Sequence, residues 1–307
     1  MGGMDSTFVK QLEYIVGAEN VLLDEPLSAH STFRVGGPAE CFVIPQSLYQ
    51  VARVVGSCRE AEVPFRIMGH GSNVLICDQG LSGVCILVSS NVSDVAVKDG
   101  GTIIAQAGAS NAKVAAEAWR AGLTGYEFAA GIPGTIGGAA IMNAGAYDGE
   151  FKDVATSVLC LDPAGHIVTI DREQADWGYR RSMMEEQGYI VLSATLQLKP
   201  GDPSAIRARM DELARRRSDK QPIELPSAGS TFKRPPGHYA GKLIQDAGLM
   251  GYGVGGAQVS TKHAGFVVNV DGATASDVKQ VIDDVRARVL ADSGVLLEPE
   301  VRLWGFE

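Results

Sequence analysis

Glycine is concentrated in one stretch of this chain, where residue types and spacing indicate ligand binding by the backbone. Residues 131–145 read Gly-Ile-Pro-Gly-Thr-Ile-Gly-Gly-Ala-Ala-Ile-Met-Asn-Ala-Gly. Glycine is costly to order, so such a cluster is expected where the backbone needs a positive φ, a tight turn or N–H contact with a ligand. A shorter glycine-containing run, Gly69-His70-Gly71-Ser72-Asn73, lies earlier in the chain. Either run alone could be an ordinary turn, but together they favour a phosphate-bearing cofactor.

The flanks of residues 69–73, the first glycine loop, exclude the common nucleotide-binding motifs. Phe65-Arg66-Ile67-Met68 precedes this loop and Val74-Leu75-Ile76 follows it, so it is predicted to join two strands. A Rossmann fingerprint or a P-loop requires a helix directly after the glycines. Successive N–H groups in a turn can still bind an anion. Two irregular glycine-rich loops resemble the flavin-binding domain shared by vanillyl-alcohol oxidase and p-cresol methylhydroxylase, and this resemblance implies FAD.

Further motifs match one family in the same order along the chain. Besides the first glycine loop and the second glycine stretch (residues 131–145), they are Thr32-Phe33-Arg34-Val35-Gly36-Gly37, Asn143-Ala144-Gly145-Ala146-Tyr147, Tyr179-Arg180, Ser227-Ala228-Gly229-Ser230-Thr231-Phe232-Lys233-Arg234-Pro235, Gly255-Gly256-Ala257-Gln258-Val259 and Glu298-Pro299-Glu300-Val301-Arg302. Each motif is weak alone, whereas the ordered set is specific. On this basis the chain resembles, over nearly its whole length, the UDP-N-acetylenolpyruvoylglucosamine reductases of bacterial cell-wall synthesis.

The resemblance implies an NADPH-dependent flavoenzyme that reduces UDP-N-acetylglucosamine enolpyruvate to UDP-N-acetylmuramate. Hydride addition to a vinyl ether conjugated to a carboxylate leaves negative charge on the adjacent carbon. A site for this reaction needs fixed cationic or hydrogen-bond-donating groups where the charge develops, and a proton donor within reach. Non-covalent FAD would supply the hydride after taking it from NADPH.

The same resemblance implies three catalytic residues. Ser230, in a Gly-Ser-x-Phe-Lys context, is the expected proton donor, although its own surroundings fit a turn residue. Arg180, in Tyr-Arg-x-Ser, is expected to polarise the enolpyruvyl carboxylate, which suits a planar guanidinium; Arg181 is the alternative. Glu300 is expected to orient the substrate or join the proton network, with Glu298 as the alternative if the strand register is misread.

The remaining predicted site residues bind the cofactor or the substrate. Expected cofactor-binding residues are Thr32, Arg34, Gly69, His70, Gly71, Ser72, Asn73, Gly131, Ile132, Pro133, Gly134, Thr135, Gly137, Gly138, Asn143, Gly145 and Ala146. Expected substrate-binding residues are Tyr179, Lys220, Arg234 and Gln258. Lys220 could equally be a solvated lysine at a helix end, and Arg34 a structural ion-pair residue. Covalent attachment of the flavin through His70 is not expected, because the order is Gly-His-Gly rather than Gly-Gly-His, and no metal site is predicted.

Two departures indicate the shorter second type of this family. Arg234 stands where better-known members carry asparagine, and an insertion bearing the tyrosine that closes over the nucleotide is not evident. How the uridine diphosphate is held is therefore left open.

Two other functions also stay open: an FAD-dependent alcohol or hydroxy-acid oxidase, and a non-catalytic nucleotide-sugar-binding flavoprotein. The set of Arg180, Ser230 and Glu300 argues against the oxidase, because substrate oxidation needs a base rather than a proton donor.

Composition agrees with this interpretation. A chain of 307 residues suits two domains, and a formal net charge of −9 argues against nucleic acid or an anionic membrane as a partner. Without a signal-peptide or transmembrane pattern, we expect a cytoplasmic monomer that acts on a small-molecule substrate. Buried, reduced thiols with no metal-binding spacing are expected at Cys41, Cys58, Cys77, Cys85 and Cys160.

The elements that must position these residues follow from caps and apolar periodicity. Helices are predicted over 47–60 with Ser47 as cap, over 110–121 with Ser110 as cap, and over 205–217. A further helix is predicted from an apolar face between Val278 and Val289; Thr274 or Ser276 is its expected cap, and Gly294 is expected to end it. Strands are predicted on both sides of the first glycine loop, through 86–88, over 102–106, and as a closing strand over 295–303.

The expected fold class is α/β (α+β), with a two-part FAD-binding domain of the vanillyl-alcohol oxidase type and a smaller α+β substrate-binding domain. Pro200-Gly201-Asp202-Pro203 punctuates the chain. We therefore expect an N-terminal segment (1–30), an FAD-binding domain (31–200) and a substrate-binding domain (201–307).

Overall fold

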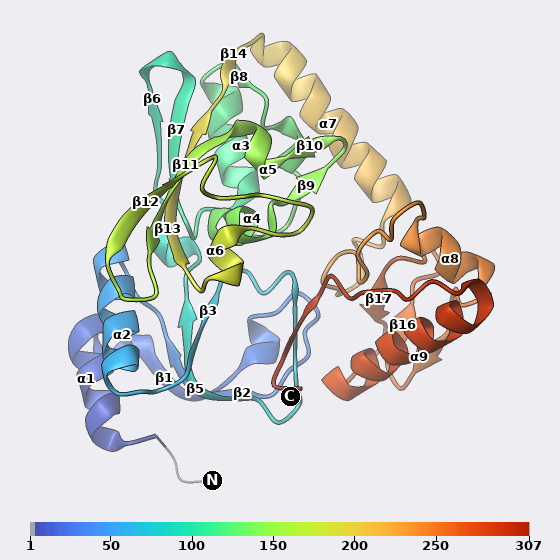
Figure 1. The fold of residues 1–307 in the computed structure, drawn as a ribbon, viewed down its shortest axis with the longest axis horizontal. Coiled ribbons are helices and arrows are strands. Elements are labelled where there is room, and N and C mark those ends of the chain that lie inside the picture. Colours follow the sequence, from blue (N-terminus) through green and yellow to red (C-terminus); the bar gives the residue numbers. More distant parts are fainter. Residues whose placement is uncertain (1–3, 307) are drawn as a thin grey trace. The chain divides into compact units, whose positions relative to one another are not determined.

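The computed structural model describes residues 4–306, so the first three residues of the predicted N-terminal segment and residue 307 lie outside it. The chain forms two compact units that are assembled from separated segments (Figure 1). The first unit comprises the described residues up to 23, residues 41–70 and residues 83–216. The second unit comprises residues 24–40, 71–82 and the described residues from 217 onward. The chain therefore passes from the first unit to the second within the first glycine loop, after His70.

Helices and strands alternate in the first unit. Its helices are α1 (Ser6–Val16), α2 (Leu48–Glu60), α3 (Asn111–Arg120), α4 (Ile136–Met142), α5 (Phe151–Val154), α6 (Met183–Glu186) and α7 (Pro203–Lys220), the last of which continues into the second unit, with 3-10 turns at Ala18–Asn20, Ser90–Val92, Asp99–Gly101 and Glu127–Ala129. A four-stranded sheet has the order β1 (Val21–Pro26), β2 (Pro38–Val43), β5 (Leu81–Leu87), β3 (Phe65–Met68), in which β3 and β5 pair in parallel.

A five-stranded sheet forms the centre of the first unit. Its order is β12 (Ile167–Asp171), β11 (Ala155–Leu161), β13 (Ile190–Gln197), β7 (Thr102–Gln106), β6 (Val95–Lys98), and every neighbouring pair is antiparallel. Two small antiparallel pairs accompany it: β9 (Gly145–Ala146) with β10 (Gly149–Glu150), and β8 (Leu123–Thr124) with β14 (Lys199–Pro200). Helix α4 packs on β13 and β7, and one apolar core runs through the unit.

The second unit has its own apolar core. Helix α9 (Ala275–Ser293) packs on a sheet of β15 (Gly253–Val254), β16 (Ala257–Val259) and β17 (Val267–Asn269), as Figure 1 shows in orange and red. Helix α8 (Ala240–Asp246) packs on α9. Strand β4 (Val74–Ile76) pairs in parallel with β18 (Arg302–Trp304), and a 3-10 turn spans Leu27–Ala29.

Most predicted helices are confirmed together with their caps. Ser47 Oγ accepts from Gln50 N at 3.2 Å, and Ser110 Oγ accepts from Lys113 N at 3.1 Å. Helix α7 is longer at both ends than the predicted 205–217. Of the two candidate caps for α9, the cap is Thr274, whose hydroxyl accepts from Asp277 N at 3.0 Å. The helix ends at Gly294 with φ 72°, as predicted from the freedom of glycine at positive φ.

The predicted closing strand over 295–303 is wrong for most of its length. Only Arg302–Trp304 is a strand. Pro299 has no N–H, and this segment makes a single bridge between Pro299 and Phe232. Glu298 O therefore accepts from Lys233 N and Glu300 N donates to Thr231 O, in the segment that follows Ser230, while Glu300 O accepts from Asn73 Nδ2.

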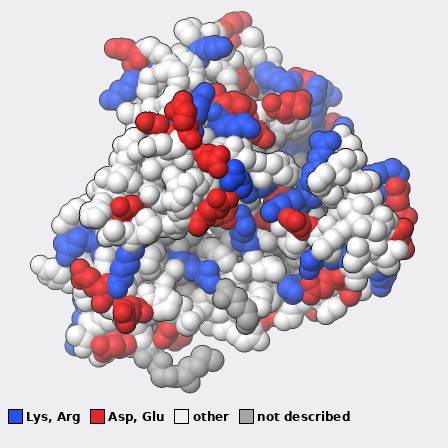
Figure 2. All heavy atoms as spheres, viewed as in Figure 1, with Lys and Arg blue, Asp and Glu red and all other residues white. Residues whose placement is uncertain are grey.

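The surface mixes charges of both signs. On the face drawn in Figure 2, acidic and basic side chains are interspersed rather than separated into one basic surface. Helix α7 carries such pairs, including Arg207 with Asp211 and Arg209 with Glu212. Among residues 4–306, no helix is both long and apolar enough to cross a membrane.

Candidate functional site

The first glycine loop and the second glycine stretch meet in the first unit. A Cβ placed on Gly69 would lie 2.6 Å from Thr135 Oγ1, which is closer than real Cβ atoms approach an oxygen. Thr135 is buried and caps α4, with its hydroxyl 3.5 Å from Gly138 N. The structure therefore brings two predicted cofactor-binding segments together, and the contact requires glycine at position 69.

Protein contacts fix the backbone of residues 132–136 against the start of α3. Asn111 N donates to Gly134 O at 3.2 Å, and Ile136 N donates to Ala109 O at 2.8 Å. The buried Asn111 amide also donates to Ile132 O at 3.3 Å, and its oxygen accepts from the Tyr126 hydroxyl at 2.8 Å. These residues were missed by sequence reasoning, because an asparagine at the start of a helix gives no sign of the loop it will hold.

The glycines at the start of α4 have different reasons to be glycine. Gly137 N donates to Ala107 O at 2.8 Å, and a Cβ on Gly137 would lie 3.1 Å from Ala107 Cβ, so close packing explains this glycine. Gly138 is exposed, and a Cβ there would meet only Thr135 Oγ1, at 3.8 Å. Packing against the protein therefore does not require glycine at position 138. Gly134, with φ 123°, needs glycine for its backbone conformation.

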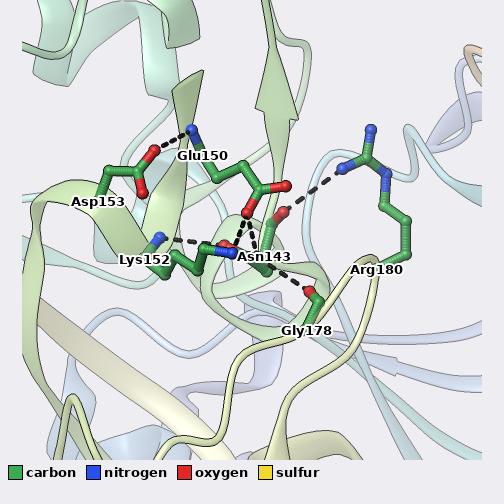
Figure 3. A network of polar contacts seen from close by, with 6 residues as sticks. All are labelled: Asn143, Glu150, Lys152, Asp153, Gly178 and Arg180. Atoms are coloured by element: carbon green, nitrogen blue, oxygen red, sulfur yellow. Dashed lines mark hydrogen bonds and ion pairs between the residues drawn. The ribbon is translucent and has the colours of Figure 1, made fainter. Parts of the chain in front are cut away.

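Arg180 is held at the C-terminal end of α4 (Figure 3). Its guanidinium donates to Asn143 O at 3.5 Å and to Gly145 O at 3.2 Å. Two neighbours in the same loop also bind α4, because Trp177 Nε1 donates to Ala140 O and Ser182 Oγ donates to Ile141 O. The loop from 177 to 182 thus satisfies carbonyl groups that the helix end leaves without a partner in the helix, and this fixes the place of Arg180.

Asn143 joins these elements. It is fully buried, and its φ of 43° ends α4 in the left-handed conformation that asparagine tolerates. Its amide nitrogen donates to Gly178 O at 2.9 Å and to Glu150 Oε2 at 3.1 Å, and its amide oxygen accepts from Lys152 N at 3.0 Å. The side chain of this predicted cofactor-binding residue is therefore engaged by the protein.

Arg180 and its neighbour Arg181 differ in their partners. Arg181 is exposed and pairs with Asp176 at 2.8 Å and with Glu186 at 3.1 Å, so carboxylates in the protein compensate its charge. Arg180 is half-buried, has φ 55° and lies 5.0 Å from the ring centroid of Tyr179. Backbone carbonyl groups therefore orient Arg180, whereas carboxylates orient Arg181.

The other end of the first glycine loop lies in the second unit, next to the Thr32 motif. Thr32 donates to Gly71 O through its N–H at 3.2 Å and through its hydroxyl at 3.3 Å. Arg34 is exposed and has φ 56°. Asn73 Nδ2 donates to Glu300 O at 3.2 Å, and Asn73 O accepts from Arg302 N at 2.9 Å. A predicted cofactor-binding residue and a predicted catalytic residue thus lie side by side.

Ser230 is exposed, and it directly precedes the buried Thr231, which fixes the local backbone. Thr231 N donates to Gly265 O at 2.8 Å, Thr231 O accepts from Glu300 N at 2.8 Å, and its hydroxyl accepts from Val267 N at 2.9 Å. The structure therefore brings the Ser230 segment to Glu300. Sequence reasoning missed Thr231, although its place between an exposed serine and a buried phenylalanine is a signal of an anchoring residue.

Glu298 differs from Glu300 in its surroundings. Its side chain is 69% exposed and pairs with Lys233 at 3.4 Å. Glu300 is half-buried, and both its N–H and its carbonyl are bound to predicted site segments, at Thr231 and Asn73. Glu300 is therefore held at the Ser230 segment through its backbone, whereas Glu298 is held through its side chain.

The remaining predicted substrate-binding residues lie on separate elements. Lys220 is exposed at the last position of α7, and the half-buried Gln258 lies in β16 opposite Gly253 and Val268. Arg234 stacks on the Tyr239 ring, with its guanidinium carbon 4.0 Å from the centroid. Within residues 4–306, no hydrogen bond or ion pair joins Lys220 or Gln258 to Ser230.

Two histidines near these segments have altered basicity. Burial lowers the pKa of His70 in the first glycine loop. Burial also lowers the pKa of His263, whose Nδ1 accepts from Gly265 N at 3.1 Å. Both imidazoles are therefore neutral at neutral pH. Within residues 4–306, no cluster of three or more histidine, cysteine, aspartate or glutamate side chains could hold a metal ion.

Comparisons with known proteins agree on one family. The model of an FAD-binding domain matches residues 39–171, and that of the UDP-N-acetylenolpyruvoylglucosamine reductase C-terminal domain matches residues 221–304. The reductase of this name from Lachnoclostridium phytofermentans is 47% identical over 98% of both chains. The crystal structure of the Thermus caldophilus reductase is 34% identical, covers 92% of this chain and 98% of its own, and has a TM-score of 0.78. A structure of alkyldihydroxyacetonephosphate synthase, 17% identical over 65% of this chain and 42% of its own, has a TM-score of 0.50 and shows a similar fold only.

Proposed function

This chain belongs to the UDP-N-acetylenolpyruvoylglucosamine reductase family, and from that premise we propose that it reduces UDP-N-acetylglucosamine enolpyruvate to UDP-N-acetylmuramate with NADPH, in peptidoglycan precursor synthesis. The observation that carries the proposal is similarity over 98% of the chain to a reductase of this activity. This chain has the fold class of the family: an FAD-binding domain of the vanillyl-alcohol oxidase type and a smaller C-terminal α+β domain.

The residues of the first unit fit FAD. The close contact of Gly69 with Thr135 and the open backbone at Gly138 form a surface that side chains would obstruct. The proposed cofactor-binding residues are those expected from the sequence: Gly69, His70, Gly131, Ile132, Pro133, Gly134, Thr135, Gly137, Gly138, Asn143, Gly145 and Ala146 in the first unit, and Thr32, Arg34, Gly71, Ser72 and Asn73 in the second unit. Bound non-covalently, FAD supplies a hydride that originates from NADPH. Residues 31–200 form the proposed FAD-binding domain and 201–307 the proposed substrate-binding domain.

Arg180 is the proposed partner of the enolpyruvyl carboxylate. Negative charge develops on the carbon next to this carboxylate during the reduction, and a fixed cation stabilises it without reorganisation. Residues 177–182 are bound to α4, and the Arg180 guanidinium donates to the carbonyls of Asn143 and Gly145. These contacts fix the orientation of the guanidinium. A planar fork with two donors suits a carboxylate better than the point charge of a lysine does.

Ser230 is the proposed proton donor, and Glu300 orients the substrate or takes part in the proton network. A serine hydroxyl is a weak acid, so transfer to the carbanion requires a fixed geometry. The bonds of Thr231 to Gly265, Val267 and Glu300 provide a rigid support for the Ser230 backbone. Tyr179, Lys220, Arg234 and Gln258 are the proposed substrate-binding residues.

The cellular location, oligomeric state and partners of the enzyme are also part of the proposal. The enzyme acts in the cytoplasm as a monomer, and neither nucleic acid nor a membrane is a partner. The formal net charge of −9 and the interspersed surface charges of Figure 2 support the statement that neither nucleic acid nor an anionic membrane is a partner.

The proposed function is tested by following NADPH absorbance under anaerobic conditions with purified, yellow protein. We expect loss of NADPH that depends on the enolpyruvyl sugar, one UDP-N-acetylmuramate formed per NADPH consumed, and release of the flavin into the supernatant on acid precipitation. Hydrogen peroxide formation with an alcohol or hydroxy acid in air would identify an oxidase instead. Binding of the sugar without NADPH consumption would identify a non-catalytic flavoprotein.

A further inference from the structure

Both carbonyl groups that accept from Arg180 belong to residues that contact one acidic residue, Glu150. Figure 3 shows Glu150 together with Asn143 and Arg180. Glu150 Oε2 accepts from the Asn143 amide nitrogen at 3.1 Å, and Asn143 O is one acceptor of Arg180. In the hairpin of β9 and β10, Glu150 lies directly opposite Gly145, whose carbonyl is the other acceptor. A Cβ on Gly145 would come within 3.0 Å of Glu150 Cγ, so the two residues are in tight contact.

Glu150 is itself fixed from several directions. Its N–H donates to Asp153 Oδ2 at 2.8 Å at the start of α5, and its carboxylate pairs with Lys152 Nζ at 2.6 Å. The turn of the hairpin, with Tyr147 at φ 51° and Asp148 at φ 66°, has the two positive φ angles of a tight two-residue connection. The hairpin is therefore a defined support rather than a loose loop.

The charge of Glu150 is maintained at neutral pH. Burial opposes its ionisation, but hydrogen bonds from Lys152 and Asn143 and the charges of Lys152 and Arg180 outweigh burial and hold the pKa of Glu150 below its usual value. An ionised carboxylate accepts stronger hydrogen bonds than a neutral one. The bond to Asn143 is thus of the charge-assisted kind.

We propose that Glu150 is a positioning residue for Arg180: through Asn143 and the hairpin contact with Gly145, it sets the direction in which the guanidinium meets the substrate carboxylate. This inference rests on the proposed function, because it takes Arg180 as the residue that binds the enolpyruvyl group. Glu150 does not itself touch the substrate.

The test measures the two half-reactions by stopped-flow absorbance: flavin reduction by NADPH, and flavin reoxidation by the enolpyruvyl sugar. Glu150→Ala, and Glu150→Asp, whose carboxylate is too short to reach Asn143, should slow reoxidation by about 10- to 100-fold, as for other misaligned catalytic groups. Glu150→Gln retains the length and an acceptor oxygen, so it should recover most of the rate. Flavin reduction should be nearly unchanged in all three variants.

A double-mutant cycle tests whether Glu150 acts through Arg180. In the Arg180→Ala background, Glu150→Asp should have no further effect on reoxidation. Equal slowing by Glu150→Asp in both backgrounds, or slowing of both half-reactions together, would overturn the positioning role. Glu186→Ala, which removes a carboxylate from Arg181, is the matched control and should leave both half-reactions unchanged. If Arg180→Ala alone leaves reoxidation unchanged, the proposed catalytic assignment of Arg180 is what fails.

Discussion

At the scale of single residues, adjacent candidates differ in their partners. The Tyr-Arg-x-Ser context points to Arg180 and leaves Arg181 as the alternative; in the structure Arg181 pairs with Asp176 and Glu186, and Arg180 donates to Asn143 O and Gly145 O. In the same way, Glu298 pairs with Lys233, whereas Glu300 is bound through its backbone to Thr231 and Asn73. Family motifs give the candidate residues and their alternatives, but the side-chain partners of each candidate could not be predicted from them.

Asp78 gives a prediction for stability at this scale. Its carboxylate accepts from Ala275 N at 2.7 Å, from Ser276 N at 2.9 Å and from Ser276 Oγ at 2.6 Å, which tethers the loop after β4 to the start of α9. Burial alone would raise the pKa of Asp78, but these hydrogen bonds outweigh it and lower the pKa. Its stabilising contribution is therefore present above the pKa of an unfolded aspartate and is lost as pH falls through the lower, folded pKa.

We expect Asp78→Asn to lower the free energy of unfolding at neutral pH by about 1–2 kcal/mol, as for the loss of other charged helix-capping groups. The difference from the unchanged protein should shrink below about pH 4, where the aspartate of the unfolded chain is protonated. Urea unfolding at several pH values measures it. Asp246→Asn, at an exposed ion pair with Lys242, is the control and should change stability by less than about 1 kcal/mol. A pH-independent effect of Asp78→Asn would contradict this account.

At the scale of elements, caps and apolar periodicity predict helices well, whereas packing decides the exceptions. Helices α2, α3 and α9 begin at predicted caps. Helix α4 was not predicted, because its glycines weaken helix propensity, and it forms because it packs on β13 and β7. The segment over 295–301 has the alternation of a strand, but Glu298 O accepts from Lys233 N, Glu300 N donates to Thr231 O, and Glu300 O accepts from Asn73 Nδ2. Both exceptions lie next to predicted site residues.

The two glycines of α4 form a matched pair for a second prediction. Gly138→Ala should raise the stability of the flavin-free protein by up to about 1 kcal/mol, because alanine favours a helix and has room there. The same change should weaken FAD binding, if the cofactor approaches the backbone at Gly138. Gly137→Ala should instead destabilise the protein, because its Cβ would crowd Ala107. Thermal unfolding measures the change in stability, and flavin fluorescence titration measures the change in FAD affinity. Unchanged FAD affinity in Gly138→Ala would contradict the proposal that the cofactor approaches the backbone at Gly138.

At the scale of the whole molecule, the sequence predicts two parts but not how the chain divides between them. Each unit has a separate apolar core, and residues 24–40 and 71–82 belong with the C-terminal half. Local periodicity depends only on residues within one element, so it cannot predict pairing between distant segments, such as that of β4 with β18.

All five cysteines are buried, as predicted, and burial raises the pKa values of Cys58, Cys85 and Cys160 to about 12.

The central claim is that Ser230 delivers the proton in the second half-reaction, and stopped-flow measurement of Ser230→Ala tests it most directly. Flavin reduction by NADPH should remain nearly normal, because that step needs no proton from the hydroxyl. Flavin reoxidation by the enolpyruvyl sugar should slow by about 10²–10⁴-fold, as expected for loss of a positioned general acid, and Ser230→Cys should recover part of the loss. If Ser230→Ala slows both half-reactions equally, or neither, Ser230 is a turn residue and the mechanism proposed for this chain is wrong.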